Sequence, residues 1–192
     1  MRIFLFIILA SLLGFSKSEI TENQVSGSDS RLKKAKGILY LNQKAFSGYL
    51  VTYSNDGQLI SKTGYLNGKL EGVSQKWTAE GQLTEERNYH QNQRTGRHVG
   101  YFENGQKRFE YYFNRGLPIE THKEWLEDGQ LYSISNYNAK GQPEGEQKLY
   151  FPSGKIRANY VVKNGRRYGL LGAKGCMGEN ERRGAGFLMR GV

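Results

Sequence analysis

The sequence predicts an all-β protein, an elongated single-sheet array of stacked antiparallel β-hairpins with a period of about 24 residues. Three observations predict this fold. An aromatic residue and a glycine recur together at a nearly fixed interval. Short segments rich in aromatic and β-branched residues separate the turns. No segment carries apolar residues at helical spacing over three turns.

The repeat is marked by one glycine in each predicted turn. Successive turn glycines are 24, 24, 24 and 25 residues apart, and an aromatic residue lies four positions before each. The turn sequences NDG, AEG, ENG, EDG and PSG contain residues that tolerate positive φ, so they predict hairpin turns. The glycines are Gly57, Gly81, Gly105, Gly129 and Gly154, and the aromatic residues are Tyr53, Trp77, Tyr101, Trp125 and Tyr150.

A second aromatic line and a second glycine series complete the unit. The aromatic line is Tyr65, Tyr89, Phe113 and Tyr137, with Val162 in the last unit. The glycines are Gly48, Gly72, Gly96, Gly145 and Gly169, and Glu120 stands where the period predicts another. Each unit therefore reads as two short strands and two turns. Stacking gives each aromatic residue a neighbour of its own kind, which a single hairpin lacks. The end units need caps, and the segments flanking the repeats are the candidates.

Four segments divide the chain. Residues 1–18 read as a signal peptide, because a basic start and an apolar run over residues 3–15 precede Ser16-Lys17-Ser18. The alternative is an uncleaved membrane anchor. Residues 19–37 read as a flexible leader, 38–169 as the repeat domain and 170–192 as a basic, glycine-rich tail. We therefore expect an exported, soluble protein in the periplasm, on the outer surface or in the medium.

The distribution of charge and the number of cysteines argue against some classes of function. The net charge is +10, but residues 41–162 hold 15 basic and 13 acidic side chains, the usual state of a solvated surface. Residues 163–192 hold seven basic and two acidic side chains, so half of the excess lies in the end of the repeat domain and the tail together. A nearly neutral array in an exported protein argues against nucleic-acid binding. Cys176 is the only cysteine, which excludes an internal disulfide.

Several stretches resemble the variant MORN repeat, whose unit reads roughly Tyr-x-Asn-Gly-Lys-x-x-Gly, an aromatic residue and Asn-Gly-x-Leu. They are YLNGKLEGVSQKWTAEGQL at 65–83, YFENGQKRFEYYFNRG at 101–116 and WLEDGQLYSISNY at 125–137. The departures are Lys44, Asn92, Glu120 and an extra residue in NAKGQ. The resemblance covers about residues 38–169. It implies a binding or scaffolding role, and bacterial proteins of this type are often described as toxin–antitoxin antitoxin components.

The sequence offers no candidate for catalysis. His98 and His122 occupy equivalent positions, so a two-histidine metal site is conceivable, but surface or turn positions are the favoured interpretation. The paired carboxylates Glu85-Glu86 and Glu127-Asp128 lack an apolar pocket that would raise a pKa. A nucleophile elbow, a P-loop and a dinucleotide fingerprint are all missing. We therefore expect no enzymatic activity, no cofactor and no metal.

The first aromatic line, Tyr53, Trp77, Tyr101, Trp125 and Tyr150, is the candidate binding ladder. The alternative is that both aromatic lines form the core. The main hypothesis is a protein-interaction module or scaffold at the bacterial envelope, antitoxin-like in one version, with a protein as its partner. Two other hypotheses stay open. The ladder could bind envelope glycan, or the basic tail could associate with an anionic membrane surface.

Overall fold

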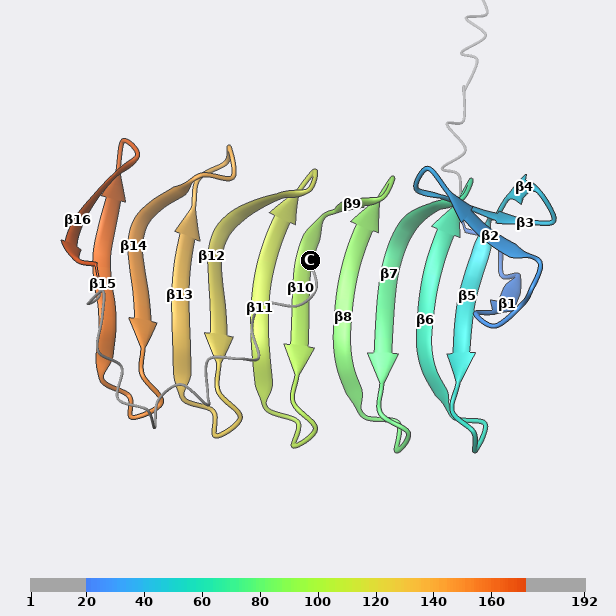
Figure 1. Ribbon diagram of the computed structural model, residues 1–192, viewed down its shortest axis with the longest axis horizontal. Helices are drawn as coiled ribbons and strands as arrows, with labels where there is room; N and C mark the ends of the chain where they lie inside the picture. The colour runs from blue at the N-terminus through green and yellow to red at the C-terminus, as the bar shows by residue number, and fades with distance from the viewer. Residues whose placement is uncertain (1–19, 172–192) are drawn as a thin grey trace, which may run out of the picture.

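A computed structural model describes residues 20–171 of the chain. These residues form one long row of strands and no helix, so the predicted all-β array of stacked antiparallel hairpins is confirmed (Figure 1). The main sheet is 13-stranded. It holds β1 (Gln24–Ser26), β5 (Gly48–Tyr53), β6 (Leu59–Leu66), β7 (Lys69–Trp77), β8 (Leu83–His90), β9 (Gln93–Arg94), β10 (Gly96–Tyr101), β11 (Lys107–Asn114), β12 (Leu117–Trp125), β13 (Leu131–Tyr137), β14 (Pro143–Tyr150), β15 (Ile156–Lys163) and β16 (Arg166–Leu170).

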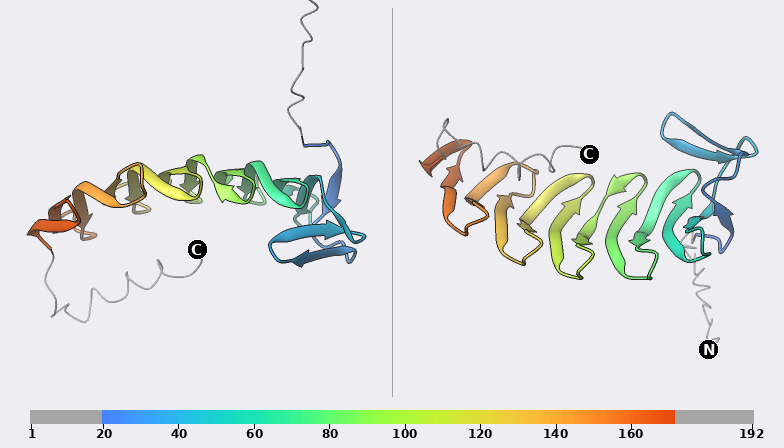
Figure 2. Two further views of the ribbon diagram at one scale, coloured as in Figure 1. Left: turned by 90° about the horizontal axis from the view of Figure 1, so that it is seen from above. Right: turned by 60° about the horizontal axis from the view of Figure 1, so that its bottom comes forward.

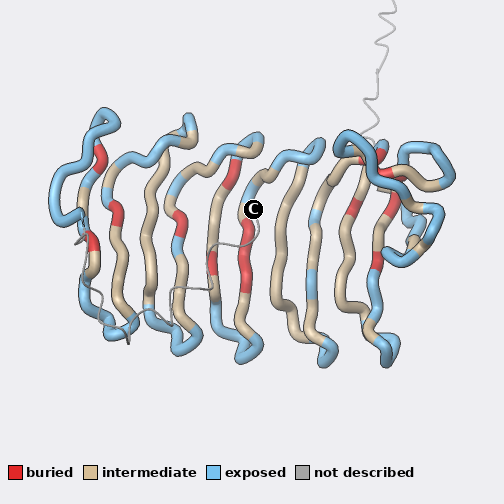
Figure 3. Tube along the Cα trace, viewed as in Figure 1, coloured by how far each residue is buried: buried red, intermediate tan, exposed pale blue. Residues whose placement is uncertain are grey.

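From β5 to β16 each strand pairs with its neighbours in the sequence, and the short β9 pairs only with β8. Seen from above, the row is a single layer (Figure 2). Buried side chains are few and lie mostly in the middle of the strands (Figure 3). The array is therefore stabilised mainly by contacts between adjacent hairpins, as expected for a repeat protein.

The N-terminal segment differs from the flexible leader expected for residues 19–37. Within it, β1 pairs in parallel with β5, and β2 (Leu32–Ala35) pairs with β3 (Ile38–Leu41). Strands β2, β3 and β4 (Lys44–Ala45) form a separate three-stranded sheet. Residues 38–45 thus belong to this small sheet and not to a further repeat of the array. The segment is ordered because β1 covers the edge of β5, which would otherwise be open.

The five turns that follow the residues of the candidate binding ladder, here called the ladder turns, share one backbone conformation. In each of them a glycine adopts positive φ. Gly57, Gly81, Gly105, Gly129 and Gly154 have φ between +77° and +86°. In each turn the glycine N–H donates to the carbonyl three residues earlier, for example Gly105 to Phe102 at 3.0 Å. An L side chain rarely adopts this backbone conformation, so the turn selects glycine.

The opposite ends of the hairpins mostly use tighter turns. Asn67-Gly68, Gln91-Asn92, Arg115-Gly116 and Asn164-Gly165 have positive φ at both residues, as in two-residue hairpin turns. The extra residue in NAKGQ converts the turn at 138–142 to the ladder type, since Gly141 N–H donates to Asn138 and Asn138 N–H donates to Gln142. The sequence departure is therefore a change of turn type.

Three positions of the second glycine series lie at β-bulges, whereas Gly48 and Gly169 lie in regular pairs with Tyr65 and Tyr160. In β7, β12 and β14, three residues lie opposite one residue of the preceding strand. Gly72, Glu120 and Gly145 occupy these bulges with φ of +69°, +59° and +77°. Bulges bend a strand, and these three strands curve over at their upper ends (Figure 1). Glu120 thus keeps the backbone conformation of the glycine that the period predicts.

Candidate interaction surface

The five ladder residues lie in one line along the sheet. Each is the last residue of its strand, namely of β5, β7, β10, β12 and β14. Ladder strands alternate with return strands, so neighbouring rings are two strand spacings apart, about 10 Å. Tyr53 is 49% exposed, and Trp77, Tyr101, Trp125 and Tyr150 are half-buried. The structure therefore brings the predicted ladder together as a regular, partly exposed row.

Residues of the return strands separate the rings of the ladder. Across each hairpin the aromatic residue pairs with the residue that follows the turn, for example Tyr53 with Leu59 and Trp125 with Leu131. At β11 this residue is Lys107, whose Nζ lies 5.7 Å from the centre of the Trp125 ring. The surface thus alternates between aromatic and mostly aliphatic side chains.

The turns beside the ladder also contact one another. Asn104 Nδ2 donates to the carbonyl of Glu127 in the next turn, at 2.8 Å. A Cβ placed on Gly129 would lie 2.7 Å from Oε1 of Gln106 in the preceding turn. The repeated Gly-Gln pair therefore has a structural role in this part of the array, because glutamine of one turn packs against glycine of the next. A shallow hollow borders Trp77, Gln82 and Glu103 at this edge.

The second aromatic line lies on the other face of the sheet, because side chains alternate along each strand. Its members lie opposite the second glycine series, for example Tyr65 opposite Gly48 and Phe113 opposite Gly96. Phe113 is buried. This line is the more interior of the two, so of the two aromatic lines in the alternative interpretation this one is the better candidate for the core.

His98 and His122 are not the surface or turn residues that we expected. They are 1% and 8% exposed and alternate with rings of the second line. Ring centres lie 5.6 Å apart for Tyr89–His98, 4.8 Å for His98–Phe113, 5.2 Å for Phe113–His122 and 4.7 Å for His122–Tyr137. The two histidines therefore complete a continuous aromatic row across five strands, β8 and β10 to β13.

Each buried histidine also bridges two strands. His98 Nε2 donates to the carbonyl of Asn88 at 2.9 Å, and His122 Nε2 donates to that of Tyr112 at 2.8 Å. Gln147 makes the equivalent bond to Asn136. The 24-residue spacing of the histidines indicated that the two share a role, since a repeated position implies a repeated contact, but not that the contact is internal.

Burial lowers the pKa of both histidines. For His98 the hydrogen bond to Asn88 opposes this effect, and Arg87 and Arg94 add to it. For His122 the bond to Tyr112 and the nearby Glu124 oppose the effect of burial, and Arg94 adds to it. The described residues contain no group of three or more His, Cys, Asp or Glu side chains that could hold a metal ion.

The strand carboxylate Glu85 is occupied by ion pairs. Glu85 lies 2.8 Å from Arg87 and 3.4 Å from Lys76. Burial raises the pKa of Glu85, but Arg87 and Lys76 outweigh burial and hold that pKa below its usual value. This carboxylate therefore stays ionised, which does not favour a proton-donating role at neutral pH.

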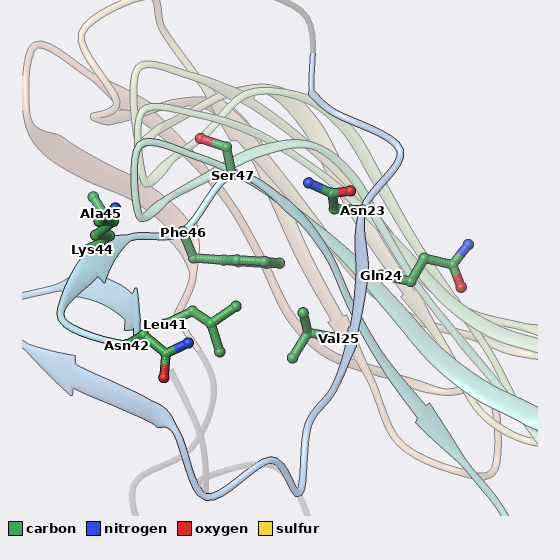
Figure 4. A pocket seen from close by; sticks show the side chains of 9 residues that line it. All are labelled: Asn23, Gln24, Val25, Leu41, Asn42, Lys44, Ala45, Phe46 and Ser47. Atoms are coloured by element: carbon green, nitrogen blue, oxygen red, sulfur yellow. The ribbon is translucent and has the colours of Figure 1, made fainter.

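A second hollow, of about 480 Å³, lies at the N-terminal end (Figure 4). Val25, Leu41 and Phe46 face one another across it, with Asn23 and Asn42 beside them. Its walls come mostly from β1 and from the small sheet, which lie outside the row of hairpins from β5 to β16. It supplies no titratable pair, so it adds no catalytic chemistry.

The family model of the MORN repeat variant matches residues 70–91 and 143–164. The chain carries MORN repeats. Both matched segments contain most of one hairpin with a ladder turn, β7–β8 in the first and β14–β15 in the second. A comparison with curated proteins finds no match. Among residues 20–171 of this MORN-repeat chain, no helix is long and apolar enough to cross a membrane.

Proposed function

We propose that this MORN-repeat protein is a non-catalytic binding module exported to the bacterial envelope, where its ladder holds a partner protein. MORN repeats are commonly protein- or membrane-binding modules. The observation that carries the proposal is the regular row of partly exposed rings from Tyr53 to Tyr150. Aromatic side chains are enriched at protein interfaces, where they contribute much of the binding free energy. Neutralisation of a toxin would be one form of this activity.

The test compares two variants on the same face. Tyr53→Ser removes a ladder ring that is 49% exposed, and Val73→Ser removes an apolar side chain that is 43% exposed and off the ladder. The full chain and both variants are used as bait for native envelope extract. One protein retained by wild type and Val73→Ser, but bound about tenfold or more weakly by Tyr53→Ser, supports the proposal. Equal binding by all three baits contradicts a role for the ladder.

The second candidate is envelope glycan, and the regular spacing of the ladder favours it. Rings repeated about every 10 Å along a straight line offer evenly spaced platforms for a linear polysaccharide. Wall polysaccharide that is retained free of protein, and lost with Tyr53→Ser, would favour this candidate over the first. Binding at high salt distinguishes association of the tail with anionic lipid from binding by the ladder. High ionic strength screens exposed charges and weakens the first, but it leaves contacts with the aromatic rings largely intact. Residues 172–192 of the tail, the signal peptide and Cys176 lie outside the described residues.

A further inference from the structure

The two ends of the main sheet differ. At the N-terminal end, β1 pairs with β5, and Tyr49 N–H donates to the carbonyl of Asn23 at 2.7 Å. At the other end β16 pairs only with β15 within residues 20–171. An edge strand presents N–H and C=O groups that can pair with another chain.

Exposed apolar side chains gather at this second end. Of the eight large apolar side chains that are exposed in the described part of the chain, five lie at or beyond the start of β15. Val161, Tyr168 and Leu170 share one face of the last hairpin, since Val161 lies opposite Tyr168 and Leu170 is two residues further along β16. The remaining two are Ile156 and Leu171.

Asparagine occupies the equivalent position in two of the four inner repeats, and Gly64 and Tyr112 occupy it in the other two. Val161 corresponds to Asn88 and Asn136. Asn88 Nδ2 donates to the carbonyl of Arg97 at 2.6 Å, and Asn136 Nδ2 donates to that of Glu146. These bonds link a strand to the next strand of the array. In the last hairpin Val161 has no amide with which to bond a further strand, and its side chain offers a neighbour an exposed apolar contact.

We propose that β16 pairs antiparallel with β16 of a second copy of this chain, with Tyr168 opposite the same residue of the other copy. This register places Arg166 opposite Leu170 and Arg167 opposite Gly169, so arginines do not face arginines. Arg167 lies with its guanidinium 5.5 Å from the centre of the Tyr160 ring, on the face away from Tyr168. The pairing therefore brings no like charges directly together.

The pairing has defined symmetry. Identical strands in antiparallel register are related by a two-fold axis perpendicular to the sheet. Val161, Tyr168 and Leu170 of both copies then form one apolar cluster on one face. The ladders of the two copies lie on that same face, at opposite edges of a continuous sheet.

A second copy suits this edge better than the chain's own tail does. Residues 172–192 contain six glycines, and glycine is a poor strand former because it adds no side chain to pack. The tail also lacks alternating apolar residues over its first half. The β16 strand of a second copy, in contrast, carries an apolar face that can pack beside the exposed apolar face of β16.

The first test is sedimentation velocity of the full chain over a range of concentrations, with reductant present so that Cys176 cannot cross-link. Val161→Glu places a charge in the cluster, and Val73→Glu makes the same change at a side chain of nearly equal exposure in the middle of the array (42% and 43%). We expect wild type and Val73→Glu to dimerise and Val161→Glu to be monomeric. A monomeric wild type, or identical behaviour of the two variants, overturns the proposal.

The second test fixes the register in a Cys176→Ser background. Tyr168→Cys places two thiols directly across the two-fold axis and should form an intermolecular disulfide on oxidation. Leu170→Cys should not, because its two copies lie about 13 Å apart along the strands, beyond disulfide reach. Cross-linking by both variants or by neither overturns this register. Neither test involves the ladder or a partner, so its outcome is independent of the proposed function.

Discussion

His122 Nε2 lies 2.8 Å from the carbonyl oxygen of Tyr112, and the hydrogen bond spans the bulge at which β12 leaves regular pairing with β11. One repeat later Gln147 donates to Asn136 in the same way. An imidazole and an amide therefore perform one structural task at equivalent positions. They differ in that only the imidazole can become charged near neutral pH.

This difference predicts how stability depends on pH. Burial lowers the pKa of His98 and His122 below 6.5 in the folded protein. Below that pH the unfolded chain binds more protons than the folded chain, so the free energy of unfolding decreases as pH falls. Replacing both histidines, His98→Gln with His122→Gln, should flatten this dependence between about pH 7 and about pH 5, because glutamine does not titrate. Urea unfolding at several pH values measures it.

The converse variant provides the control. Gln147→His places a third histidine at the equivalent position and should steepen the loss of stability in the same pH range. An unchanged slope in both the double variant and Gln147→His would contradict a role for buried histidines. The carboxylate of Glu85 affects stability in a separate range, below about pH 4.5, because its pKa lies below that of the histidines.

The sequence predicted the array but misplaced these histidines, and the reason is physical. The fold follows from spacing, since aromatic residues and turn glycines at a fixed interval leave few arrangements other than stacked hairpins. A histidine at a fixed interval fits a solvated stripe and an internal row equally well. The contact that decides between them is with a carbonyl across a bulge, and bulges leave no composition signal beyond one glycine.

Glu120→Gly should stabilise the protein. Glu120 has φ +59° at a bulge, makes no side-chain hydrogen bond or ion pair among the described residues and is exposed. Left-handed backbone costs a non-glycine residue about 1–2 kcal/mol, and the extra freedom of glycine in the unfolded chain offsets about 0.5–1 kcal/mol of this gain. We expect a net increase of about 0.5–1 kcal/mol in the free energy of unfolding, measured by denaturant titration with an unchanged slope.

The equivalent glycine gives the matched comparison. Gly96 has φ +61°, and a Cβ there would meet only the Asn88 Cβ, at 3.9 Å. Gly96→Ala should therefore destabilise by about 1 kcal/mol through backbone conformation alone. Glu120→Ala should bring no gain, since alanine keeps the unfavourable φ. A stabilising Glu120→Ala would show that the glutamate side chain and not the backbone is responsible.

Gly100→Ala should destabilise for a different reason. The backbone at Gly100 is outside the left-handed region, but a Cβ there would collide with the Phe109 ring that covers it. Phe109 is buried and cannot move freely. Overpacking of this kind costs about 1–3 kcal/mol. Combining Gly100→Ala with Phe109→Leu should cost less than the sum of the two single variants, which a double-mutant cycle of unfolding free energies measures.

The strands of the N-terminal segment could not have been predicted from the repeat pattern. Strands β1 and β2 have only three and four residues, too few for alternation to be recognised. Their partners are distant in sequence, since Gln24 pairs with Tyr49. The need for a cap on the first repeat was predictable from the open edge of a sheet, but the residues that provide the cap were not.

Glu85→Gln should destabilise the array more than any other single loss of a carboxylate charge in its centre. The Glu85 side chain is 12% exposed and lies within 4 Å of Lys76, Arg87 and Arg108. Glutamine keeps the shape but leaves three cations without their counter-charge, at a cost of about 1–3 kcal/mol. Glu146→Gln is the matched control, because its pair with Lys148 is exposed and such pairs contribute little. Chemical unfolding at neutral pH compares the two variants. The difference should begin to shrink as pH falls below about 4.5, where this glutamate is protonated in the unfolded chain, and should be lost once pH falls below the lowered pKa of folded Glu85. Equal stability of Glu85→Gln and Glu146→Gln would show that the Glu85 ion pairs do not hold adjacent hairpins together.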